Sequence, residues 1–222
     1  MQLTPHSHGV SKEATGRIRQ KNEEIILQAA EEEFALHGFK GASMQAIAER
    51  AGLPKANIHY YFKNKLSLYA GVLSQVIDLW DTTLNELNEN QEPAEVLPLY
   101  IAEKIRFSRD YPQASRVFAK EILSGAPLLK DYFSNDYQAW FESRVEVFRA
   151  WIKQGKMDSV DPAHLVFLIW SSTQHYADFA VQIEAAIGKS SLEETDYDAA
   201  TQTLIKVILN GCGIRLQANE SS

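Results

Sequence analysis

The short stretch that follows Pro54 carries side chains of the kinds that contact nucleic acids. Asparagine can pair with an adenine edge through two hydrogen bonds, lysine can reach guanine or phosphate, and alanine can touch the methyl group of thymine. Histidine and tyrosine can donate hydrogen bonds to phosphate oxygens. Ile58 and Phe62, four positions apart, would face inward. That arrangement leaves five candidate DNA contacts on the outer face, which are Lys55, Ala56, Asn57, His59 and Tyr60.

The residues before this stretch predict a helix-turn-helix that would present it. Ser43 can cap a first helix through its hydroxyl, and Ile47 and Ala48 are spaced to lie on the inner face of that helix. Gly52 would end the helix, and Pro54 suits the first turn of the next one because proline has no amide hydrogen to lose. Any small helical hairpin also carries polar residues outside, so the pattern alone leaves a hairpin without DNA affinity as an alternative.

Basic charge is concentrated in the same part of the chain. Residues 1–65 hold nine Lys or Arg against seven Asp or Glu, whereas residues 66–222 hold 13 against 22, within a net charge of -7. A basic domain attached to an acidic body can bind phosphate on one face while the remainder repels DNA. Lys65, just beyond the stretch, could clamp the phosphate backbone, and the candidate DNA contacts also include Ser43 at the start of the first helix.

The segment GLPKANIHYYFKNKLSLYAGVL resembles the amino-terminal domain of the TetR family of bacterial transcriptional repressors. The family pattern has Ile-Ala, then Ala-Gly-Val, then Tyr-Phe and a Lys, and the matching residues here are Ile47-Ala48, Ala51-Gly52-Leu53, Tyr61-Phe62 and Lys65. One position departs, because His59 stands where the family usually has a phosphate-contacting Tyr. That contact is then weaker, sensitive to pH or shifted to Tyr60.

The rest of the composition argues against several other protein classes. No apolar run approaches the length of a bilayer span and the amino terminus lacks the order of a signal peptide, so we expect a soluble cytoplasmic protein. The single cysteine, Cys212, has no companions at metal-ligand spacing, so we expect no metal and no cofactor. His175, Asp178 and Glu121 could be imagined as an acid-base set, but no nucleophile or phosphate loop accompanies them, and we expect no enzyme.

Prolines and glycines divide the chain into about nine expected helices. The first would run from about residue 19 to 37 with Gly38 as a left-handed cap, and a long one would begin at residue 64 or 65. Later ones would open at Pro93, Pro112, Pro127 (to about 154) and Pro162 (to about 186), and the last would cover 197–210. No stretch alternates with period two, which predicts an all-α fold. The expected divisions are a flexible basic arm (1–18), a helix-turn-helix DNA-binding domain (19–65), a ligand-binding and dimerisation domain (66–216) and a flexible tail (217–222).

The last two expected helices carry apolar residues around more of their circumference than one core face needs. Four such helices from two chains could bury one another in a homodimer, and the alternative is that all of these residues belong to an intramolecular core. The positions are Leu165, Phe167, Leu168, Ala177, Val181, Ala185, Leu204, Ile205, Val207, Ile208 and Leu209.

Aromatic and amide side chains in the body form a second candidate site. Trp170 and Gln174 are four positions apart and so point the same way from one helix. A planar heterocycle could stack on an indole while an amide meets paired carbonyl and N–H groups on the ring edge. Aromatic residues at helical spacing also form ordinary core, which is the alternative. The candidate ligand contacts are Trp80, Phe118, Trp170, Thr173, Gln174 and Tyr176, with Asp178 either a polar anchor or, as we favour, a buried salt-bridge partner.

Residues 108–129 and 169–185 resemble the corresponding segments of pyrimidine-utilisation repressors within the TetR family, which respond to uracil and thymine. The resemblance implies a homodimeric regulator, with no need of a cofactor, that binds a near-palindromic DNA operator and is released by a small planar effector. It places Trp80, Trp170 and Gln174 first among the effector contacts. A TetR-type repressor with a different effector, such as a related heterocycle, an amide or a drug, is the alternative that the residues leave open.

Overall fold

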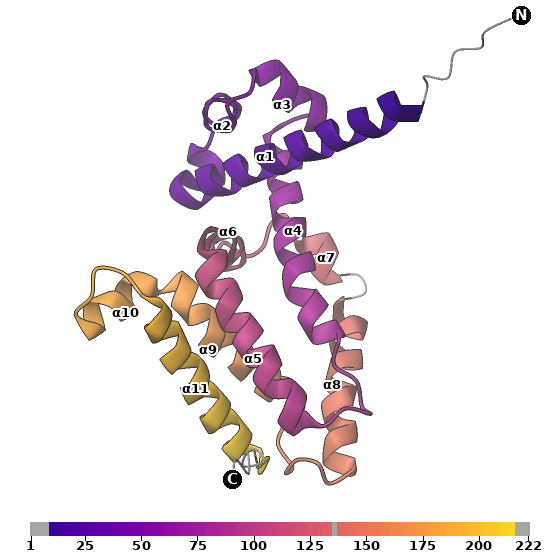
Figure 1. Cartoon of the computed structure of the whole chain (residues 1–222), viewed down its shortest axis with the longest axis vertical. Helices are drawn as coiled ribbons and strands as arrows, with labels where there is room; N and C mark the ends of the chain where they lie inside the picture. Colours follow the sequence, from indigo (N-terminus) through magenta and orange to yellow (C-terminus); the bar gives the residue numbers. More distant parts are fainter. Residues whose placement is uncertain (1–8, 135–136, 216–222) are drawn as a thin grey trace, which may run out of the picture. The chain divides into compact units, whose positions relative to one another are not determined.

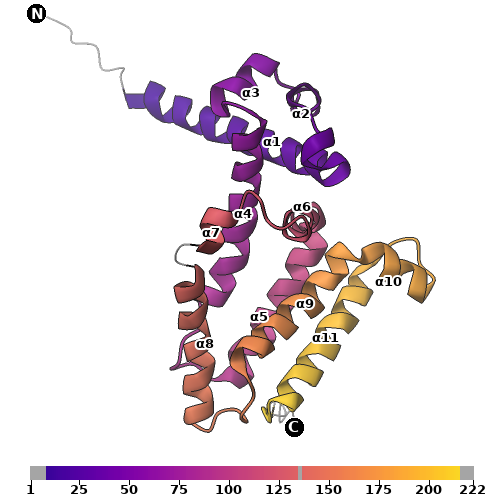
Figure 2. The same cartoon turned by 180° about the vertical axis from the view of Figure 1, so that it is seen from behind.

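A computed structural model describes residues 9–134 and 137–215, and these residues form helices joined by short turns, with no strand among them (Figure 1, Figure 2). Eleven helices are present in the described residues, not about nine. The difference arises at two places where one expected helix is divided into two. None of the helices in the described ranges is long and apolar enough to cross a membrane.

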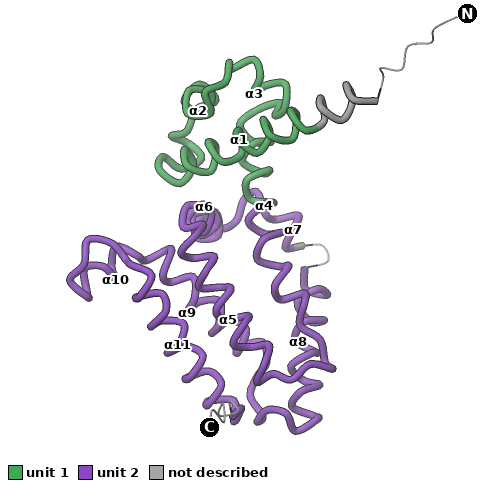
Figure 3. Tube along the Cα trace, viewed as in Figure 1, with its two compact units in different colours: residues 1–74 green, residues 75–222 purple. Residues whose placement is uncertain are grey.

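The chain forms two compact units, residues 1–74 and 75–222 (Figure 3). The first unit contains α1 (Gly9–Gly41), α2 (Met44–Ala51), α3 (Lys55–Tyr61) and the beginning of α4 (Lys65–Asn85). The boundary therefore falls inside α4 and not at residue 65. Helix α1 packs against α2, and α2 packs against α3. The core of this unit is mainly apolar and includes Ile26, Ala30, Phe34, Ile47, Ile58 and Leu68.

The start and the end of α2 have the cap geometry that the sequence predicts. The hydroxyl oxygen of Ser43 accepts a hydrogen bond from the backbone N–H of Ala46 at 3.1 Å. Gly52 ends the helix in the left-handed conformation, with φ 65° and ψ 26°. A side chain at this φ would be strained, so glycine is suited to the turn between the two helices.

The amino-terminal helix differs from its expected form. Residues 9–18 belong to α1, although a flexible arm was expected over residues 1–18, of which residues 1–8 lie outside the described ranges. Gly38 interrupts the helix with φ 65° and ψ 175°, which is not the left-handed cap that we expected, and helical turns continue to Gly41. The expected tail, residues 217–222, also lies outside the described ranges.

The second unit contains the rest of α4 and seven further helices. These are α5 (Pro93–Asp110), α6 (Pro112–Leu123), α7 (Lys130–Ser134), α8 (Tyr137–Lys153), α9 (Pro162–Asp178), α10 (Ala180–Ile187) and α11 (Glu194–Gly211). Helix α5 packs against α6, α9 and α11. The core that α5, α9 and α11 share with α8 includes Tyr100, Ile101, Phe148, Trp151, Ile169 and Leu209.

Two expected helices of this unit are broken. Pro127 does not open a helix, because the preceding residues form a tight turn in which Gly125 (φ 87°) and Ala126 (φ 51°) have positive φ. Proline disfavours the helical conformation in the residue that precedes it, which here is Ala126. The helix begins only at Lys130. The helix from Pro162 ends at Asp178, where Phe179 takes φ -117° and ψ 24° before α10 begins.

Candidate functional site

Helix α3 presents the side chains that the sequence assigned to DNA contact. Ile58 is fully buried and Phe62 nearly so, while Lys55, Ala56, Asn57, His59 and Tyr60 are exposed. Tyr60 is the most exposed of the large apolar side chains on this helix, at 73 %. The structure therefore brings the five residues of α3 together on one accessible face.

Lys65 and Ser43 have contacts within their own unit. The Lys65 ammonium donates a hydrogen bond to the backbone oxygen of Ala42 at 2.8 Å and lies 4.8 Å from the centre of the Phe39 ring. This position stabilises the turn before α2, and the phosphate contact of Lys65 stays a prediction. Ser43, through its cap, fixes the start of α2.

His59 lies next to the end of α3, where its environment is exposed. Its Nδ1 atom is 3.5 Å from the backbone oxygen of Lys63. Tyr60 and Tyr61 meet edge to face with ring centres 5.2 Å apart, and the Tyr61 hydroxyl accepts a hydrogen bond from Asn22 of α1 at 3.3 Å. Tyr61 is thus fixed against α1, whereas Tyr60 is free to point outward.

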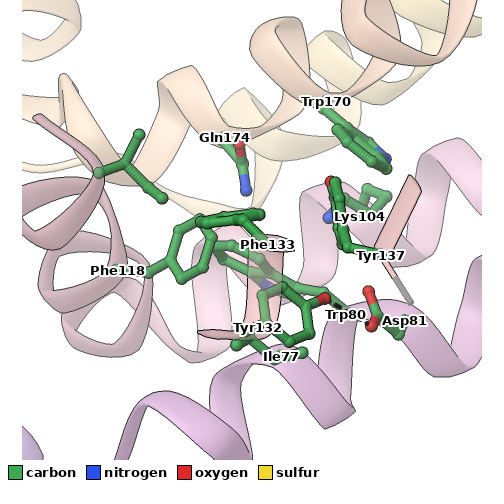
Figure 4. Close-up of a pocket in the computed structure, with 11 residues that line it drawn as sticks. Ile77, Trp80, Asp81, Lys104, Phe118, Tyr132, Phe133, Tyr137, Trp170 and Gln174 are labelled. Atoms are coloured by element: carbon green, nitrogen blue, oxygen red, sulfur yellow. Dashed lines mark hydrogen bonds between the residues drawn. The ribbon is translucent and has the colours of Figure 1, made fainter. Parts of the chain in front are cut away.

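The second unit encloses a cavity of about 240 Å³ to which six helices contribute, α4 to α9 (Figure 4). This volume is below the roughly 300–1,000 Å³ of pockets that hold drug-sized ligands, so it suits a single small ring. Aromatic rings form most of the wall. The lining residues are Ile77, Trp80, Asp81, Lys104, Phe118, Ile122, Tyr132, Phe133, Tyr137, Trp170 and Gln174.

Four of the six predicted ligand contacts line this cavity and two do not. Trp80 and Phe118 meet edge to face with ring centres 4.8 Å apart, and Trp170 and Gln174 approach from α9. Thr173 is fully buried, and its hydroxyl donates to the backbone oxygen of Ile169 at 2.7 Å. Tyr176 lies near Tyr197 of α11, with ring centres 6.4 Å apart. Neither Thr173 nor Tyr176 is therefore part of the cavity wall.

The polar groups of the wall come from separate helices. Figure 4 shows the Gln174 amide pointing into the space between the aromatic rings. The Trp170 indole N–H donates to the Tyr100 hydroxyl at 2.8 Å, which fixes the indole plane. The Tyr132 hydroxyl donates to Asp81 at 3.2 Å. The Gln174 amide makes no hydrogen bond with another described residue, so its donor and acceptor are available to a ligand.

Two charged groups face the same space. Lys104 is buried, and its Nζ atom lies 4.7 Å from the centre of the Trp80 ring. Burial lowers the pKa of Lys104 to about 7, although the carboxylates of Asp81 and Asp178 act in the opposite direction. Burial also raises the pKa of Asp81, partly offset by the Tyr132 hydrogen bond and by Lys104. The wall thus combines one cationic and one anionic group.

The sequence reasoning missed Lys104, Asp81 and the aromatic residues of α7 and α8. A signal for Lys104 was present, because it continues the buried positions Leu97 and Ile101 at spacings of four and three, followed by buried Ser108. The residues Tyr132, Phe133 and Tyr137 carry no comparable signal. Their position depends on the break between α7 and α8.

Two residues that were considered for an acid-base set, Asp178 and Glu121, make structural hydrogen bonds. Asp178 accepts a hydrogen bond from the Ser115 hydroxyl at 2.6 Å, and no described cation lies within 4.0 Å of it, so it is not the salt-bridge partner that we favoured. The carboxylate of buried Glu121 accepts a hydrogen bond from the backbone N–H of Leu128 at 2.7 Å, which fixes the turn before α7. No group of His, Cys, Asp and Glu side chains in the described residues could hold a metal ion.

Comparisons with known proteins match both units. Residues 26–72 match the family described as bacterial regulatory proteins of the tetR family. Residues 73–215 match the family described as YcdC-like protein, C-terminal region. These two matches divide the chain at residue 72, close to the boundary between the compact units.

Individual relatives are similar over most of the chain. The HTH-type transcriptional regulator RutR of Escherichia coli K12 is 42% identical over 186 residues, which cover 84% of this chain and 88% of that protein. The putative transcriptional regulator SCO4942 of Streptomyces coelicolor has a similar structure, with a TM-score of 0.66, 25% identity and coverage of 86% of this chain and 98% of that one. AibR, in complex with isovaleryl coenzyme A and operator DNA, shares the fold at a TM-score of 0.63 and 16% identity, over 84% of this chain and 97% of that one.

Proposed function

This chain belongs to the TetR family of bacterial regulatory proteins, and we propose that it is a homodimeric repressor that leaves its DNA operator when uracil or thymine fills the cavity of the second unit. Its relatives are transcriptional regulators, and the chain is a transcriptional regulator and not an enzyme. The genes that it would control are those of pyrimidine and nitrogen utilisation, as the name of the Rut regulator and the resemblance of the ligand segments suggest.

The proposal of a pyrimidine base depends chiefly on the cavity. A single flat ring suits a space of about 240 Å³ with walls of Trp80, Phe118 and Trp170. The unpaired amide of Gln174 has the donor and the acceptor that a ring edge with adjacent carbonyl and N–H groups requires. A purely lipophilic ligand would leave this amide and the Lys104 ammonium without hydrogen-bond partners, and burial of unpaired polar groups is costly.

The DNA contact would be made by α3. We expect this helix to enter the major groove, with Asn57 on base edges and with Lys55, His59 and Tyr60 on bases or phosphates. Two such helices in a dimer would meet half-sites one helical turn, roughly 34–36 Å, apart on a near-palindromic operator.

The dimer would form through α9, α10 and α11, which expose large apolar side chains. Leu168 of α9 is 52 % exposed, Val181 of α10 is 75 % exposed and Val207 of α11 is 61 % exposed. Other positions on these helices, such as Leu165, Ala177, Ile208 and Leu209, are buried within the chain and would not contribute. The exposed set supports an interface between two copies, since apolar side chains on several adjoining helices gain from mutual burial.

Helix α4 is the element through which a ligand would act on DNA binding. It is one helix that contributes residues to both units, and it supplies Trp80 and Asp81 to the cavity wall. A ligand that contacts these residues would favour the dimer geometry in which α4 suits the ligand. Release requires that this geometry bind the operator more weakly, because an effector with equal affinity for both geometries shifts nothing.

Isothermal titration calorimetry with uracil and thymine tests the effector. We expect binding by the wild type and at least tenfold weaker binding by Gln174→Leu, which keeps the size of the side chain but removes both hydrogen-bonding groups. Leu123→Ala is the matched control, since Leu123 is 85 % exposed on α6 and is not part of the cavity wall. The absence of heat with either base from a folded wild type that binds DNA would refute the pyrimidine effector and leave a repressor with another ligand.

A further inference from the structure

Lys104 is a buried cation without a direct partner. It is only 2 % exposed, yet no carboxylate oxygen of a described residue lies within 4.0 Å of its ammonium and the ammonium makes no hydrogen bond with a described residue. Its nearest interaction is with the face of the Trp80 ring, 4.7 Å away. A cation–π contact supplies only part of what an ammonium loses on leaving water. The three N–H groups of the Lys104 ammonium can therefore still donate hydrogen bonds to a ligand in the cavity.

The groups around the ammonium limit the kind of ligand that could use this capacity. Asp81 of α4 lines the wall and Asp178 of α9 also acts on Lys104, while α7 and α8 contribute the hydroxyls of Tyr132 and Tyr137. The α6 part of the wall, Phe118 and Ile122, is uncharged. An anionic ligand would bring its charge close to Asp81, so a neutral ligand with a strong acceptor oxygen fits this set better.

We propose that Lys104 binds the effector directly, by donating a hydrogen bond from its ammonium to a ring carbonyl oxygen, and that it thereby selects neutral carbonyl-bearing rings. This inference rests on the proposed function of the cavity and adds a residue and a proton requirement to it. Gln174 on α9 would form hydrogen bonds with the ring edge that carries adjacent N–H and carbonyl groups, and Lys104 on α5 would donate a hydrogen bond to a carbonyl oxygen. Two helices would then be tied to one ligand.

Dependence on pH follows from the same contact. Burial holds the pKa of Lys104 at about 7 without a ligand, and a carbonyl oxygen at the ammonium favours the charged form. Between pH 6 and pH 8 the charged fraction of such a lysine falls about tenfold. The affinity for uracil, which stays neutral over this range, should fall by about the same factor.

Calorimetric titration of the full-length protein with uracil at pH 6, 7 and 8 tests the inference. The wild type should lose about tenfold in affinity from pH 6 to pH 8. Lys104→Met should bind about ten- to a hundredfold more weakly than the wild type at pH 6 and should show no such decline. Lys156→Met is the control, because Lys156 pairs with Glu92 at 3.0 Å and is not part of this wall, and it should retain the wild-type profile.

Asp81→Asn distinguishes a direct contact between Lys104 and the ligand from a purely structural role of Lys104, because a structural role would not shift the pH dependence of binding. The carboxylate of Asp81 raises the pKa of Lys104, so its removal lowers that pKa and should move the loss of affinity to lower pH. Asparagine still offers an oxygen to the Tyr132 hydroxyl, which limits structural damage.

Different failures have different meanings. Wild-type binding with an affinity that does not vary from pH 6 to pH 8, or equal binding by Lys104→Met, would overturn the role of Lys104 and leave the pyrimidine effector in place. A wild type that binds neither uracil nor thymine at any of the three pH values would overturn both.

Discussion

Asn57 is the residue through which we expect α3 to distinguish one DNA sequence from another. It is exposed, and its amide can make two hydrogen bonds to an adenine edge. Asn57→Ala should weaken operator binding by about 1–3 kcal/mol and should change binding to random DNA much less. Fluorescence anisotropy with both kinds of DNA measures the difference.

Lys63→Ala is the matched comparison, since Lys63 is also exposed but lies between α3 and α4, and we expect it to contact only the backbone of DNA. It should weaken operator and random DNA equally and reduce the salt dependence of binding. Equal losses on both DNAs for Asn57→Ala would refute its role in base recognition.

Lys104 should lower the stability of the ligand-free protein. Its pKa of about 7 in the folded chain is below the ordinary lysine value of 10.5, so the unfolded chain binds more protons between these values and stability rises with pH from about 7 upward. Lys104→Met should raise the free energy of unfolding at pH 7, on the order of 1–3 kcal/mol, and should flatten its rise between pH 7 and pH 9. Urea unfolding at several pH values checks both effects, and a less stable variant with an unchanged pH dependence would contradict them.

The residues of the cavity show what spacing can predict. Trp170 and Gln174 share a helical face, and both line the cavity as their spacing of four implies. The neighbours of Lys104 in the sequence, Glu103 and Arg106, are typical of a lysine exposed to solvent. Only its place in the series of buried positions on α5 indicated that Lys104 is buried. Asp81 becomes a wall residue through its partner Tyr132, which lies 51 positions away in the sequence.

Helix boundaries were predictable where a side chain or a glycine fixes them locally. Ser43, Gly52 and Asp161 act as caps, and the Asp161 carboxylate accepts a hydrogen bond from the backbone N–H of His164 at 3.0 Å. The end of α9 at Phe179 has no glycine or proline to mark it. There the Phe179 ring stacks on His175 with centres 4.8 Å apart, and no residue type at this position marks the break in the sequence.

Gly71 of α4 lies where the first unit leaves little room for a side chain. A Cβ atom at Gly71 would lie 3.2 Å from Leu27 and 3.2 Å from Phe62, so a branched side chain there would push these residues apart. Gly71→Val should lower the free energy of unfolding by about 1–3 kcal/mol. Thermal and urea unfolding followed by circular dichroism measure the change.

Gly211→Ala provides the contrast, because nothing lies within 4 Å of a Cβ atom at this helical glycine. It should leave stability unchanged or raise it by up to about 1 kcal/mol. A Gly71→Val protein as stable as the wild type would show that the first unit leaves more room at Gly71 than described.

Dimerisation is the property of the whole molecule that the exposed face of α9 to α11 predicts. Val207→Glu places a charge on that face and should convert the dimer to a monomer, with operator affinity falling by at least tenfold because two linked recognition helices are lost. Leu123→Glu, at the 85 % exposed position on α6, should remain dimeric. Sedimentation equilibrium distinguishes the two, and a Val207→Glu dimer as tight as the wild type would place the interface elsewhere.

Charge is divided along the chain in a way that suits one DNA-binding face. The excess of basic over acidic residues up to residue 65 contrasts with the acidic remainder, and the composition predicted this division without knowledge of the fold. Composition does not indicate which helices would pair. That inference needed the exposed fractions, because four apolar positions of the predicted set are buried within the chain.

Release of operator DNA by a pyrimidine base is the most direct test of the central claim. A labelled operator fragment, recovered by selection from genomic DNA, is bound by the wild type and titrated with uracil while anisotropy is recorded. We predict a return to the anisotropy of free DNA for the wild type, and no change for Gln174→Leu at the same uracil concentrations. A wild-type complex that remains intact at uracil concentrations that saturate the protein in calorimetry would contradict the claim.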